Sequence, residues 1–355
     1  MGAAESWEGR RPFEVAELRA ECPGVTTVRL VPSDGEALPL AGPGQYLTLV
    51  LRIPGQDRPA IRCYSLSHDP QPSAYEITVK QTQQSDGSPG LVSSHVQSGL
   101  SVGDFVDLLA PRGSFTVDPA RPPGPLVFLA GGVGITPFMS MLESLARAQS
   151  AVPVYLYYGV RGASEHVFRE RLAGLAEEPW LQQTLAYSRP EGEPPAGVRR
   201  GRIDLELLKE TLPPSDQPYT FFICGPPPFL ESLREGLSQL GVPESHVKVE
   251  AFGAPSVRPL TRRLSRSALA ALPTVRFARS EVEATWDPNA TSLLDFAMSK
   301  SVFFPFACAA GHCGTCASSL LEGEVDYASE PQFPLREGQC LPCVAVPRTD
   351  LSLDV

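Results

Sequence analysis

The C-terminal part of this chain carries cysteines at a spacing that suits metal binding. Five of the eight cysteines lie after residue 300, three of them in a C-x4-C-x2-C run and two in a C-x2-C pair. The small residues Gly311 and Gly314 stand inside the run and permit a tight backbone path around a bound group. We expect no export signal, and we therefore expect reduced thiols rather than a disulfide framework. The sequence therefore predicts a metal centre held by thiolates.

Two kinds of metal centre fit these cysteines, and four buried structural thiols without a metal are the third alternative. Zinc sites are usually built from paired C-x2-C knuckles, and Cys340 with Cys343 supplies one such pair. The C-x4-C-x2-C run resembles the plant-type ferredoxins, which bind a 2Fe–2S cluster. That resemblance implies Cys343, which precedes a short strand, as the fourth cluster ligand, with Cys340 as the competing residue. The first three ligands are then Cys308, Cys313 and Cys316.

The tetrapeptide R-C-Y-S, which begins at Arg62, ends a predicted strand and combines three useful groups. Its guanidinium can neutralise a phosphate, its tyrosine offers an aromatic face and its serine a hydroxyl. The pattern resembles the flavin motif of the ferredoxin–NADP reductase superfamily; a structural arginine and tyrosine is the alternative. The resemblance implies that Arg62 pairs with flavin phosphate, Tyr64 faces the flavin ring and Ser65 bonds the ring nitrogen that receives hydride. Gly90 and Ser93, in the segment P-G-L-V-S, resemble the superfamily's second phosphate segment.

The segment G-G-V-G-I-T-P at residues 131–137 follows a predicted strand and opens a predicted helix. Glycines let the backbone approach a pyrophosphate, and a helix N-terminus favours its negative charge. The segment does not match G-x-G-x-x-G, but it resembles the nicotinamide-binding segment of the same superfamily. That resemblance implies cofactor contacts from Gly132, Gly134 and Thr136. An ordinary tight turn between strand and helix is the alternative.

A second predicted nicotinamide segment, C-G-P-P-P, starts at Cys224 and ends another predicted strand. In the superfamily this motif brings a cysteine close to the reactive carbon of the nicotinamide, with Gly225 and Pro226 beside the cofactor. The segment E-A-F-G resembles the superfamily's closing strand. It implies that Glu250 and Phe252 border the flavin and the hydride path, which makes Ser65, Cys224 and Glu250 the predicted catalytic residues. As isolated residues, Cys224 and Phe252 are more often found in a core.

Three residues bear on the choice between NADH and NADPH. Arg161 follows the second strand of the predicted parallel sheet, and Ser188-Arg189 follows the third. The superfamily distinguishes the 2′-phosphate of NADPH at these places, and a Ser-Arg pair resembles its NADPH-binding members. The sequence favours NADPH only slightly over NADH, because surface arginines are common throughout this chain.

These motifs require three kinds of domain to position them. The pattern of apolar residues and turn residues changes along the chain at the corresponding places. We predict an antiparallel β-barrel flavin domain at 10–119, where alternating β-branched segments are separated by Gly-Pro turns. Strand and helix alternation over 120–256 predicts an α/β nicotinamide domain with a parallel sheet. Residues 257–273 hold four arginines and no acid and are predicted to be a linker. A hairpin, a helix with Ser292 and Asp295 in a capping box, and the cysteine loop predict an α+β, β-grasp ferredoxin domain at 274–355.

Composition excludes several classes of function. The chain holds 30 Lys+Arg against 40 Asp+Glu, a net charge of −10, so we expect no nucleic-acid binding. No apolar run reaches the roughly 18 residues that span a bilayer, so we expect no membrane insertion and a cytoplasmic location. The five histidines are scattered, which argues against an oxygen-activating iron centre within the chain. We expect a monomer; the acidic ferredoxin part either steers docking onto a basic partner or is merely a solvated surface.

Taken together, the resemblances imply an electron-transfer chain. Residues 10–256 resemble the reductase module of flavohaemoglobins, and the order of the three parts resembles the phthalate dioxygenase reductase family. NAD(P)H would deliver hydride to FAD, or to FMN as in some relatives, and single electrons would pass to the 2Fe–2S cluster. The predicted partner is a separate terminal oxygenase, Rieske-type in first place and haem-thiolate second. A demethylase system as acceptor, a redox sensor, and a flavin reductase that releases reduced flavin also fit the motifs.

Overall fold

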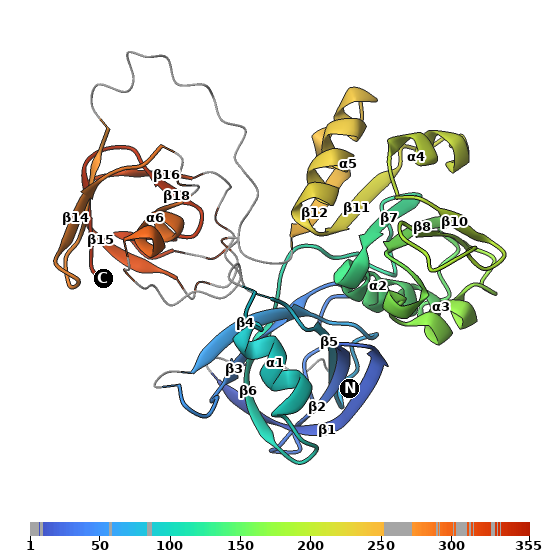
Figure 1. Ribbon diagram of the computed structural model, residues 1–355, viewed down its shortest axis with the longest axis horizontal. Coiled ribbons are helices and arrows are strands. Elements are labelled where there is room, and N and C mark those ends of the chain that lie inside the picture. Colours follow the sequence, from blue (N-terminus) through green and yellow to red (C-terminus); the bar gives the residue numbers. More distant parts are fainter. Residues whose placement is uncertain are drawn as a thin grey trace. The chain divides into compact units, whose positions relative to one another are not determined.

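The computed structural model describes residues 7, 10–56, 59–83, 87–251, 272–288, 290, 292–300, 302, 311, 314, 316–327, 331, 333 and 335–355. The chain forms two compact units, Met1–Phe252 and Gly253–Val355. Figure 1 shows it coloured along the sequence, from blue at the N-terminus to red at the C-terminus. The predicted domain boundaries remain predictions.

The first part of the first unit is an antiparallel barrel of six strands in the order β4-β3-β6-β1-β2-β5. A bridge between Leu66 and Ile77 links the chain after β4 to β5. Alternating apolar side chains such as Phe13 and Val15 fill the interior, and helix α1 (Leu91–Ser98) packs against the same core. The strands are β1 (Arg11–Cys22), β2 (Val25–Pro32), β3 (Tyr46–Leu51), β4 (Ala60–Ser65), β5 (Tyr75–Lys80) and β6 (Phe105–Arg112).

The rest of the first unit is a six-stranded parallel sheet in the order β10-β9-β8-β7-β11-β12. Its central strands are apolar throughout, as expected of strands covered on both faces. Helices α2 and α3 share one core with residues such as Phe128 and Phe222, while α4 and α5 share another with Val127 and Ile223 on the opposite face (Figure 1). The strands are β7 (Leu126–Gly131), β8 (Val154–Val160), β9 (Leu181–Tyr187), β10 (Val198–Arg200), β11 (Thr220–Gly225) and β12 (Val247–Ala251). The helices are α2 (Thr136–Arg147), α3 (Arg169–Leu175), α4 (Leu205–Thr211) and α5 (Pro227–Gln239).

The second unit is a small mixed sheet with one helix among its described residues. The sheet has the order β14-β13-β19-β15-β17, with β13 and β19 parallel, and β16 pairs with β18 separately. Helix α6 (Leu293–Ser299) begins at Ser292, whose hydroxyl accepts a hydrogen bond from the amide of Asp295 at 3.2 Å. The strands are β13 (Thr274–Phe277), β14 (Val282–Thr285), β15 (Ser318–Glu322), β16 (Val325–Tyr327), β17 (Gln339–Cys340), β18 (Ala345–Pro347) and β19 (Leu351–Leu353).

These elements confirm the predicted fold class of barrel, parallel α/β sheet and α+β ferredoxin-like unit. Two details of the parallel sheet go beyond the sequence pattern. The segment T-L-A-Y-S at 184–188 predicts the third strand, and β9 begins three residues earlier, at Leu181. The proline-rich segment 191–201 suggests disorder rather than a strand, yet β10 forms within it. Within the described part of the chain, no helix is long and apolar enough to cross a membrane.

Candidate functional site

Two glycine-bearing turns meet where the strand order of the parallel sheet reverses. Strands β7, β8 and β9 run outward on one side and β11 and β12 on the other, so the reversal lies between β7 and β11. In open α/β sheets, ligands bind at the carboxyl ends of the strands beside such a reversal. A short 3-10 turn, η1 (Gly132–Ile135), follows β7, and Pro226 follows β11. Both predicted nicotinamide segments therefore lie at the switch point.

The two glycines of the first turn do different things. A Cβ on Gly134 would lie 2.3 Å from the carbonyl oxygen of Cys224 and 2.8 Å from the amide nitrogen of Gly225, so a side chain there would push the turns apart. Gly132 has a φ of 56°, and a Cβ there would meet nothing within 4 Å. The backbone at Gly132 is thus open to the close approach of a phosphate, whereas Gly134 serves packing.

Thr136 and Pro226 complete these turns. The buried Thr136 hydroxyl donates to the carbonyl oxygen of Val133 at 3.1 Å, which closes the turn before α2. Pro226 caps α5, and a Cβ on Gly131 would lie 3.0 Å from its Cδ. These contacts give both residues a role in shaping the turns. Their predicted contacts with a cofactor stay predictions.

Ser65, Cys224 and Glu250 come together from three strands of the two sheets. Cys224 on β11 and Glu250 on β12 are partners in the parallel register. Ser65 ends β4 of the barrel, and its Oγ donates to Oε2 of Glu250 at 3.0 Å. The structure thus brings the three predicted catalytic residues to one place at the junction of barrel and sheet.

The ionisation of these groups is set by poor solvation. Burial raises the pKa of Glu250 to about 8, although the hydrogen bond from Ser65 works in the opposite direction. Glu250 keeps some exposed surface, but the protein atoms packed around its carboxyl dominate this pKa. Burial raises the pKa of Cys224 well above its ordinary value, and the neighbouring Glu250 adds to the effect. At neutral pH the site therefore holds a protonated carboxyl and a neutral thiol, two groups that can donate a proton but carry no charge.

Arg62 and Tyr64 lie on one side of β4 because successive strand residues alternate. Arg62 is exposed, whereas Tyr64 is half-buried and packs partly on the barrel core. Burial raises the pKa of Tyr64 to about 12 against the lowering effect of Arg62, so the phenol stays protonated. A cation and an aromatic ring on one side of the strand fit a phosphate-bearing ring ligand, while Ser65 points to Glu250.

Gly90 and Ser93 form the start of α1. A Cβ on Gly90 would lie 2.2 Å from Oγ1 of Thr82, and Gly90 precedes the first helical turn as its N-cap. Ser93 is buried, and its Oγ lies 3.1 Å from the amide of Thr82 and 2.9 Å from Oγ1 of Thr82. In this structure Ser93 thus ties α1 to the chain after β5. Its predicted phosphate contact stays a prediction.

Arg161, Ser188 and Arg189 lie side by side at the carboxyl ends of β8 and β9. The amide of Ser188 donates to the carbonyl oxygen of Val160 at 2.9 Å, and the amide of Arg189 to that of Arg161 at 2.7 Å. Both arginines are exposed, and Nη1 of Arg161 lies 3.5 Å from Oε1 of Glu165. Two cationic side chains at this edge suit a phosphate group, although Glu165 offsets part of the charge.

Two of the four predicted cluster ligands are within the described residues, and they converge. The Sγ atoms of Cys316 and Cys343 lie 3.2 Å apart, and both residues are buried in the second unit's core. Gly314 has a φ of 70°, and a Cβ there would lie 2.3 Å from the ring of Phe333. Cys340 is fully buried, and burial raises the pKa of its thiol to about 12, with Cys316 adding to the effect. Paired buried sulfurs fit two ligands of a thiolate-bound cluster.

The predicted ligands Cys308 and Cys313 and the predicted flavin neighbour Phe252 lie outside the described residues. Within the described residues, no group of three or more His, Cys, Asp or Glu side chains could hold a metal ion. The assignment of the complete ligand set therefore stays a prediction.

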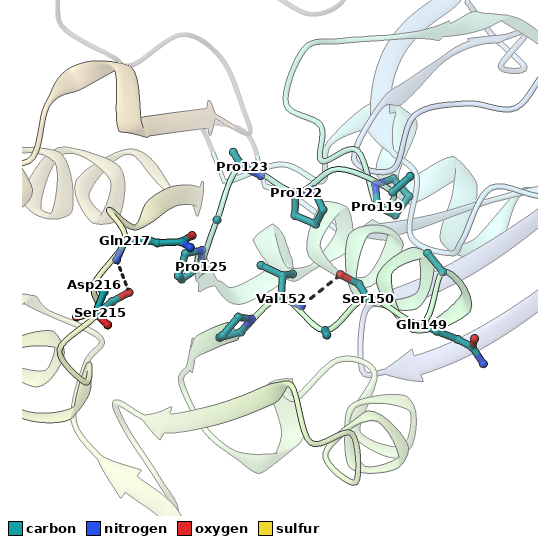
Figure 2. Close-up of a pocket in the computed structure, with 15 residues that line it drawn as sticks. Pro119, Pro122, Pro123, Pro125, Gln149, Ser150, Val152, Ser215, Asp216 and Gln217 are labelled. Carbon is teal, nitrogen blue, oxygen red and sulfur yellow. Dashed lines mark hydrogen bonds between the residues drawn. The ribbon is translucent and has the colours of Figure 1, made fainter.

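The first unit also contains a cavity of about 960 Å³, and Figure 2 shows residues that line it. Its walls come from the segments that lead into β7, β8 and β11, residues 119–120, 122–125, 148–153 and 215–217. It therefore lies at the amino ends of the strands, the edge opposite the switch point. Prolines and small residues dominate the wall, and Asp216 is the only charged side chain among the described residues that line it. This composition does not suit a phosphate or flavin site.

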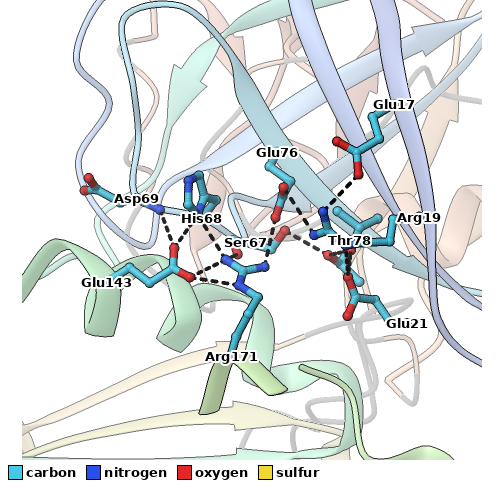
Figure 3. A network of polar contacts seen from close by, with 11 residues as sticks. Glu17, Arg19, Glu21, Ser67, His68, Asp69, Glu76, Thr78, Glu143 and Arg171 are labelled. Atoms are coloured by element: carbon cyan, nitrogen blue, oxygen red, sulfur yellow. Dashed lines mark hydrogen bonds and ion pairs between the residues drawn. The ribbon is translucent and has the colours of Figure 1, made fainter. Parts of the chain in front are cut away.

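Sequence analysis missed a set of polar residues that joins the barrel to α2 and α3. Figure 3 shows Arg171 between Glu76 and Glu143, with His68 and Asp69 beside them. None of these residues belongs to a short sequence motif. Nothing in the sequence distinguishes any of them from an ordinary solvent-exposed polar residue. The only signal available was the repeat of polar residues along one face of α2.

Comparison with known proteins identifies two family models in the chain. The model "Oxidoreductase NAD-binding domain" matches residues 128–235, which include most of β7 and all of β11. The model "2Fe-2S iron-sulfur cluster binding domain" matches residues 275–348. The two models match in the order predicted from the motifs.

Three similar proteins cover different parts of the chain. A flavohemoprotein of Deinococcus radiodurans is 35% identical over 256 residues, 71% of this chain, and the chain spans only 61% of that protein's length. The crystal structure of the flavohem-like FAD/NAD-binding domain of nitric oxide dioxygenase from Vibrio cholerae is 34% identical, with a TM-score of 0.62, covering 68% of this chain and 98% of that one. Phthalate dioxygenase reductase, described as a modular structure for electron transfer from pyridine nucleotides to [2Fe-2S], is 25% identical with a TM-score of 0.59 and 98% of both chains covered.

Proposed function

This chain belongs to the ferredoxin reductase-type NAD(P)H oxidoreductases, with a flavohaem-like reductase unit and a 2Fe–2S domain, and we propose that it is the reductase component of a multicomponent oxygenase. In this role it takes electrons from NAD(P)H and delivers them through FAD and the 2Fe–2S cluster to a separate acceptor protein. The observation that carries the proposal is the meeting of Ser65, Cys224 and Glu250 at the junction of barrel and sheet, beside the switch point, in a chain that also holds a cysteine-bearing core.

The residues that would hold each group follow from the motifs and their positions. Flavin contacts are assigned to Arg62, Tyr64, Ser65, Gly90, Ser93 and Phe252. Nicotinamide contacts are assigned to Gly132, Gly134, Thr136, Arg161, Ser188, Arg189, Gly225 and Pro226. The cluster ligands are Cys308, Cys313, Cys316 and Cys343. When bound, these groups supply hydride acceptance, the conversion of electron pairs into single electrons, and one-electron transfer.

The protein's own contribution is positioning and proton control. Gly134 allows the two turns to touch, so that ligands at the ends of β7 and β11 lie close together. Glu250 stays protonated at neutral pH and accepts a hydrogen bond from Ser65, which leaves no net charge at this junction. A neutral junction of this kind does not repel a negatively charged dinucleotide. The neutral thiol of Cys224 is likewise compatible with an approaching nicotinamide.

The acceptor is proposed to be a terminal oxygenase, with a Rieske-type protein in first place. The name of phthalate dioxygenase reductase supports this choice, because that protein matches the chain over nearly its whole length. The flavohemoprotein relatives extend well beyond the matched region, so their activity is not transferred to this chain.

For the donor we propose NADPH over NADH, on the strength of Arg161 and Arg189 at the ends of β8 and β9. Replacing Arg189 by alanine should lower kcat/KM for NADPH about tenfold and leave that for NADH within about twofold. Steady-state rates with both nucleotides measure this. Equal losses for both nucleotides would contradict the assignment.

The electron path is tested by a matched pair of cysteine variants in the full chain. Cys343→Ser should lose the visible absorbance of the cluster and reduce cytochrome c with NAD(P)H at least about tenfold more slowly. Its reduction of ferricyanide should persist, because that activity needs only the flavin. Cys340→Ser is the control, since the proposed ligand set excludes this residue, and it should retain the cluster.

Two outcomes would contradict this function. Loss of both activities in a folded Cys343→Ser protein that retains its flavin would contradict the proposed order of electron transfer. Slow turnover of the wild-type protein with cytochrome c would instead favour a redox sensor. Loss of the cluster in Cys340→Ser but not in Cys343→Ser would exchange the two residues in the ligand set.

A further inference from the structure

Helix α2 carries a polar stripe along the face that meets the barrel. Its members are Ser140, Glu143, Ser144 and Arg147, whose spacing of three, four and seven residues places them on one side of the helix. A stripe of this kind usually faces water. Here Ser140 and Ser144 are fully buried, because the stripe packs against the barrel instead.

Each member of the α2 stripe contacts the barrel. The Oγ of Ser140 accepts from the amide of Gly44 at 3.3 Å. One oxygen of Glu143 accepts from the amide of Asp69 at 3.0 Å, and the same carboxylate contacts His68. The hydroxyl of Ser144 donates to the carboxylate of Asp69. Arg147 donates to the same carboxylate, with its Nε 2.5 Å from Oδ2.

Arg171 of α3 adds a second line of contacts between the same parts (Figure 3). Its Nη1 lies 2.9 Å from Oε1 of Glu76 on β5, and its Nη2 lies 2.6 Å from Oε1 of Glu143 on α2. Nη2 also donates to the carbonyl oxygen of Ser67 at 2.8 Å. Only 22% of the Arg171 side chain is exposed, and 7% of Glu76. A guanidinium is suited to this bridge because its fork of donors can bond several oxygens at once.

The backbone is strained at the residue that precedes α3, the helix that carries Arg171. Phe168 precedes the helix with a φ of 60° and a ψ of 29°, the left-handed region that non-glycine residues rarely occupy. Its ring is buried, and the guanidinium carbon of Arg171 lies 4.8 Å from the ring centroid. Backbone strain of this kind persists only where surrounding contacts fix it. The contact between the Phe168 ring and the Arg171 guanidinium is one of the contacts that surround this strained position.

Both ends of this network are joined directly to the predicted cofactor segments. On the barrel side, His68 and Asp69 follow Ser65, the last residue of the flavin motif, by three and four residues. On the other side, α2 begins at Thr136, the end of the glycine turn, and reaches Glu143 two turns later along one rigid helix. A shift at the network would thus be transmitted to both segments.

We propose that Arg171 and Glu143, through their bridge to Glu76 and the 67–69 loop, are positioning residues that fix the distance between the flavin strand and the nicotinamide turn. The inference rests on the proposed function, since it concerns hydride transfer between these two segments. Neither residue lies among the predicted cofactor contacts, so both act through the elements that carry them. A displacement of about 1 Å in such a site can slow a reaction about a hundredfold.

The test compares Arg171→Met, Arg171→Lys and Arg199→Met in the full flavin-loaded protein. Arg199 pairs with Glu210 at 2.9 Å on the exposed surface of the same sheet domain, so its variant removes an equal charge without touching the barrel. Stopped-flow reduction by NADPH and NADH gives the limiting rate constant of flavin reduction and the apparent dissociation constant of the nucleotide. Hydrogen exchange of residues 66–71 and 136–147 reports the junction independently of activity.

Arg171→Met should lower the limiting rate constant about 10- to 100-fold and change the dissociation constant less than about threefold. The limiting rate constant of Arg171→Lys should lie between those of Arg171→Met and the wild type. Lysine restores the positive charge but not the several hydrogen-bond donors of the guanidinium. Exchange in both segments should rise in Arg171→Met, and Arg199→Met should match the wild type in every readout. If Arg171→Met does not fold, Glu143→Gln keeps the side-chain shape and should show the same pattern with smaller changes.

A wild-type limiting rate together with unchanged exchange in Arg171→Met would overturn the proposal. So would a loss confined to nucleotide affinity. If neither nucleotide reduces the wild-type flavin, the proposed function fails. The exchange measurement then still decides whether Arg171 holds the two segments together.

Discussion

Two glutamates at the junction of barrel and sheet show how differently one residue type can be used. Glu250, on β12, accepts one hydrogen bond from a neutral hydroxyl, and burial raises its pKa to about 8. Glu143, on α2, is also largely buried, and burial alone would raise its pKa. The hydrogen bond from His68 and the charge of Arg171 outweigh burial there and hold the pKa of Glu143 below its ordinary value.

The partners decide the opposite directions of the two pKa shifts, since burial by itself raises the pKa of both carboxyls. A buried carboxyl without a cation keeps its proton, because the charged form is poorly solvated. A buried carboxyl beside a guanidinium gives up its proton and becomes half of an ion pair. The junction thus has a neutral end at Glu250, close to the predicted cofactor segments, and an ionic end at Glu143, where contacts join the barrel to α2 and α3.

The largest expected effect comes from breaking the ionic end. Arg171→Met removes the cation that Glu76 and Glu143 share and leaves them only Arg19 and His68 as partners. It should lower the free energy of unfolding by about 3–5 kcal/mol. Arg199→Met, which breaks an exposed pair, should cost less than about 1 kcal/mol. Urea titration of both variants measures the difference. Similar losses in the two would remove the distinction between the junction network and an ordinary surface pair.

Glu250→Gln tests the neutral end of the junction through the pH dependence of the free energy of unfolding. The folded pKa of Glu250, about 8, exceeds its ordinary value of 4.5, so its stabilisation is complete below about pH 4.5 and is lost as the pH rises toward 8. Glutamine does not titrate. The free energy of unfolding of the variant, measured relative to the wild type, should therefore rise by about 3 kcal/mol as the pH goes from 5 to 8. Unfolding titrations at several pH values check this. A constant difference across that range would show that Glu250 is already ionised in the folded protein.

Ser65→Ala sharpens the comparison by removing the hydrogen bond to Glu250. This bond lowers the pKa of Glu250, so its loss should raise that pKa above the wild-type value. We expect a loss of about 1 kcal/mol in stability that is larger at pH 9 than at pH 6, because hydrogen bonds to an ionised acceptor are stronger. Unfolding titrations at the two pH values measure it. An equal loss at both would mean that the hydroxyl does not sense the charge of Glu250.

The smallest expected effect is that of His68→Asn at the ionic end. The hydrogen bond to Glu143 raises the pKa of His68, so its stabilisation is full below about pH 6.5 and is lost as the pH rises through the raised value. Since 38% of the His68 side chain is exposed, we expect His68→Asn to lower the free energy of unfolding by only about 0.5 kcal/mol at pH 6 and by less at pH 9. Urea titration at the two pH values measures this loss. Greater destabilisation at pH 9 would contradict the pairing with Glu143.

Much of the architecture could be predicted from local pattern. The segment V-T-T-V-R-L-V-P at 25–32 alternates as β2 requires, and the strand at Leu126 is apolar throughout because both of its faces are covered. The hairpin of β13 and β14 and the cap at Ser292 also follow from short-range signals. Strand boundaries such as that of β9 do not follow from local pattern, because strand ends depend on neighbouring strands rather than on the strand's own residues.

The sequence by itself determined which residues could do chemistry. The C-x4-C-x2-C run, the R-x-Y-S tetrapeptide and the glycine turns are short because a few adjacent backbone positions must approach a cofactor, and such needs are written locally. Tertiary structure alone decided how these segments meet. Ser65 and Glu250 are 185 residues apart, and Arg171 and Glu76 are 95 apart. The ionisation of Glu250 and Glu143 depends on the partners and on the amount of water that the fold leaves around each carboxyl. No local sequence pattern records either of these.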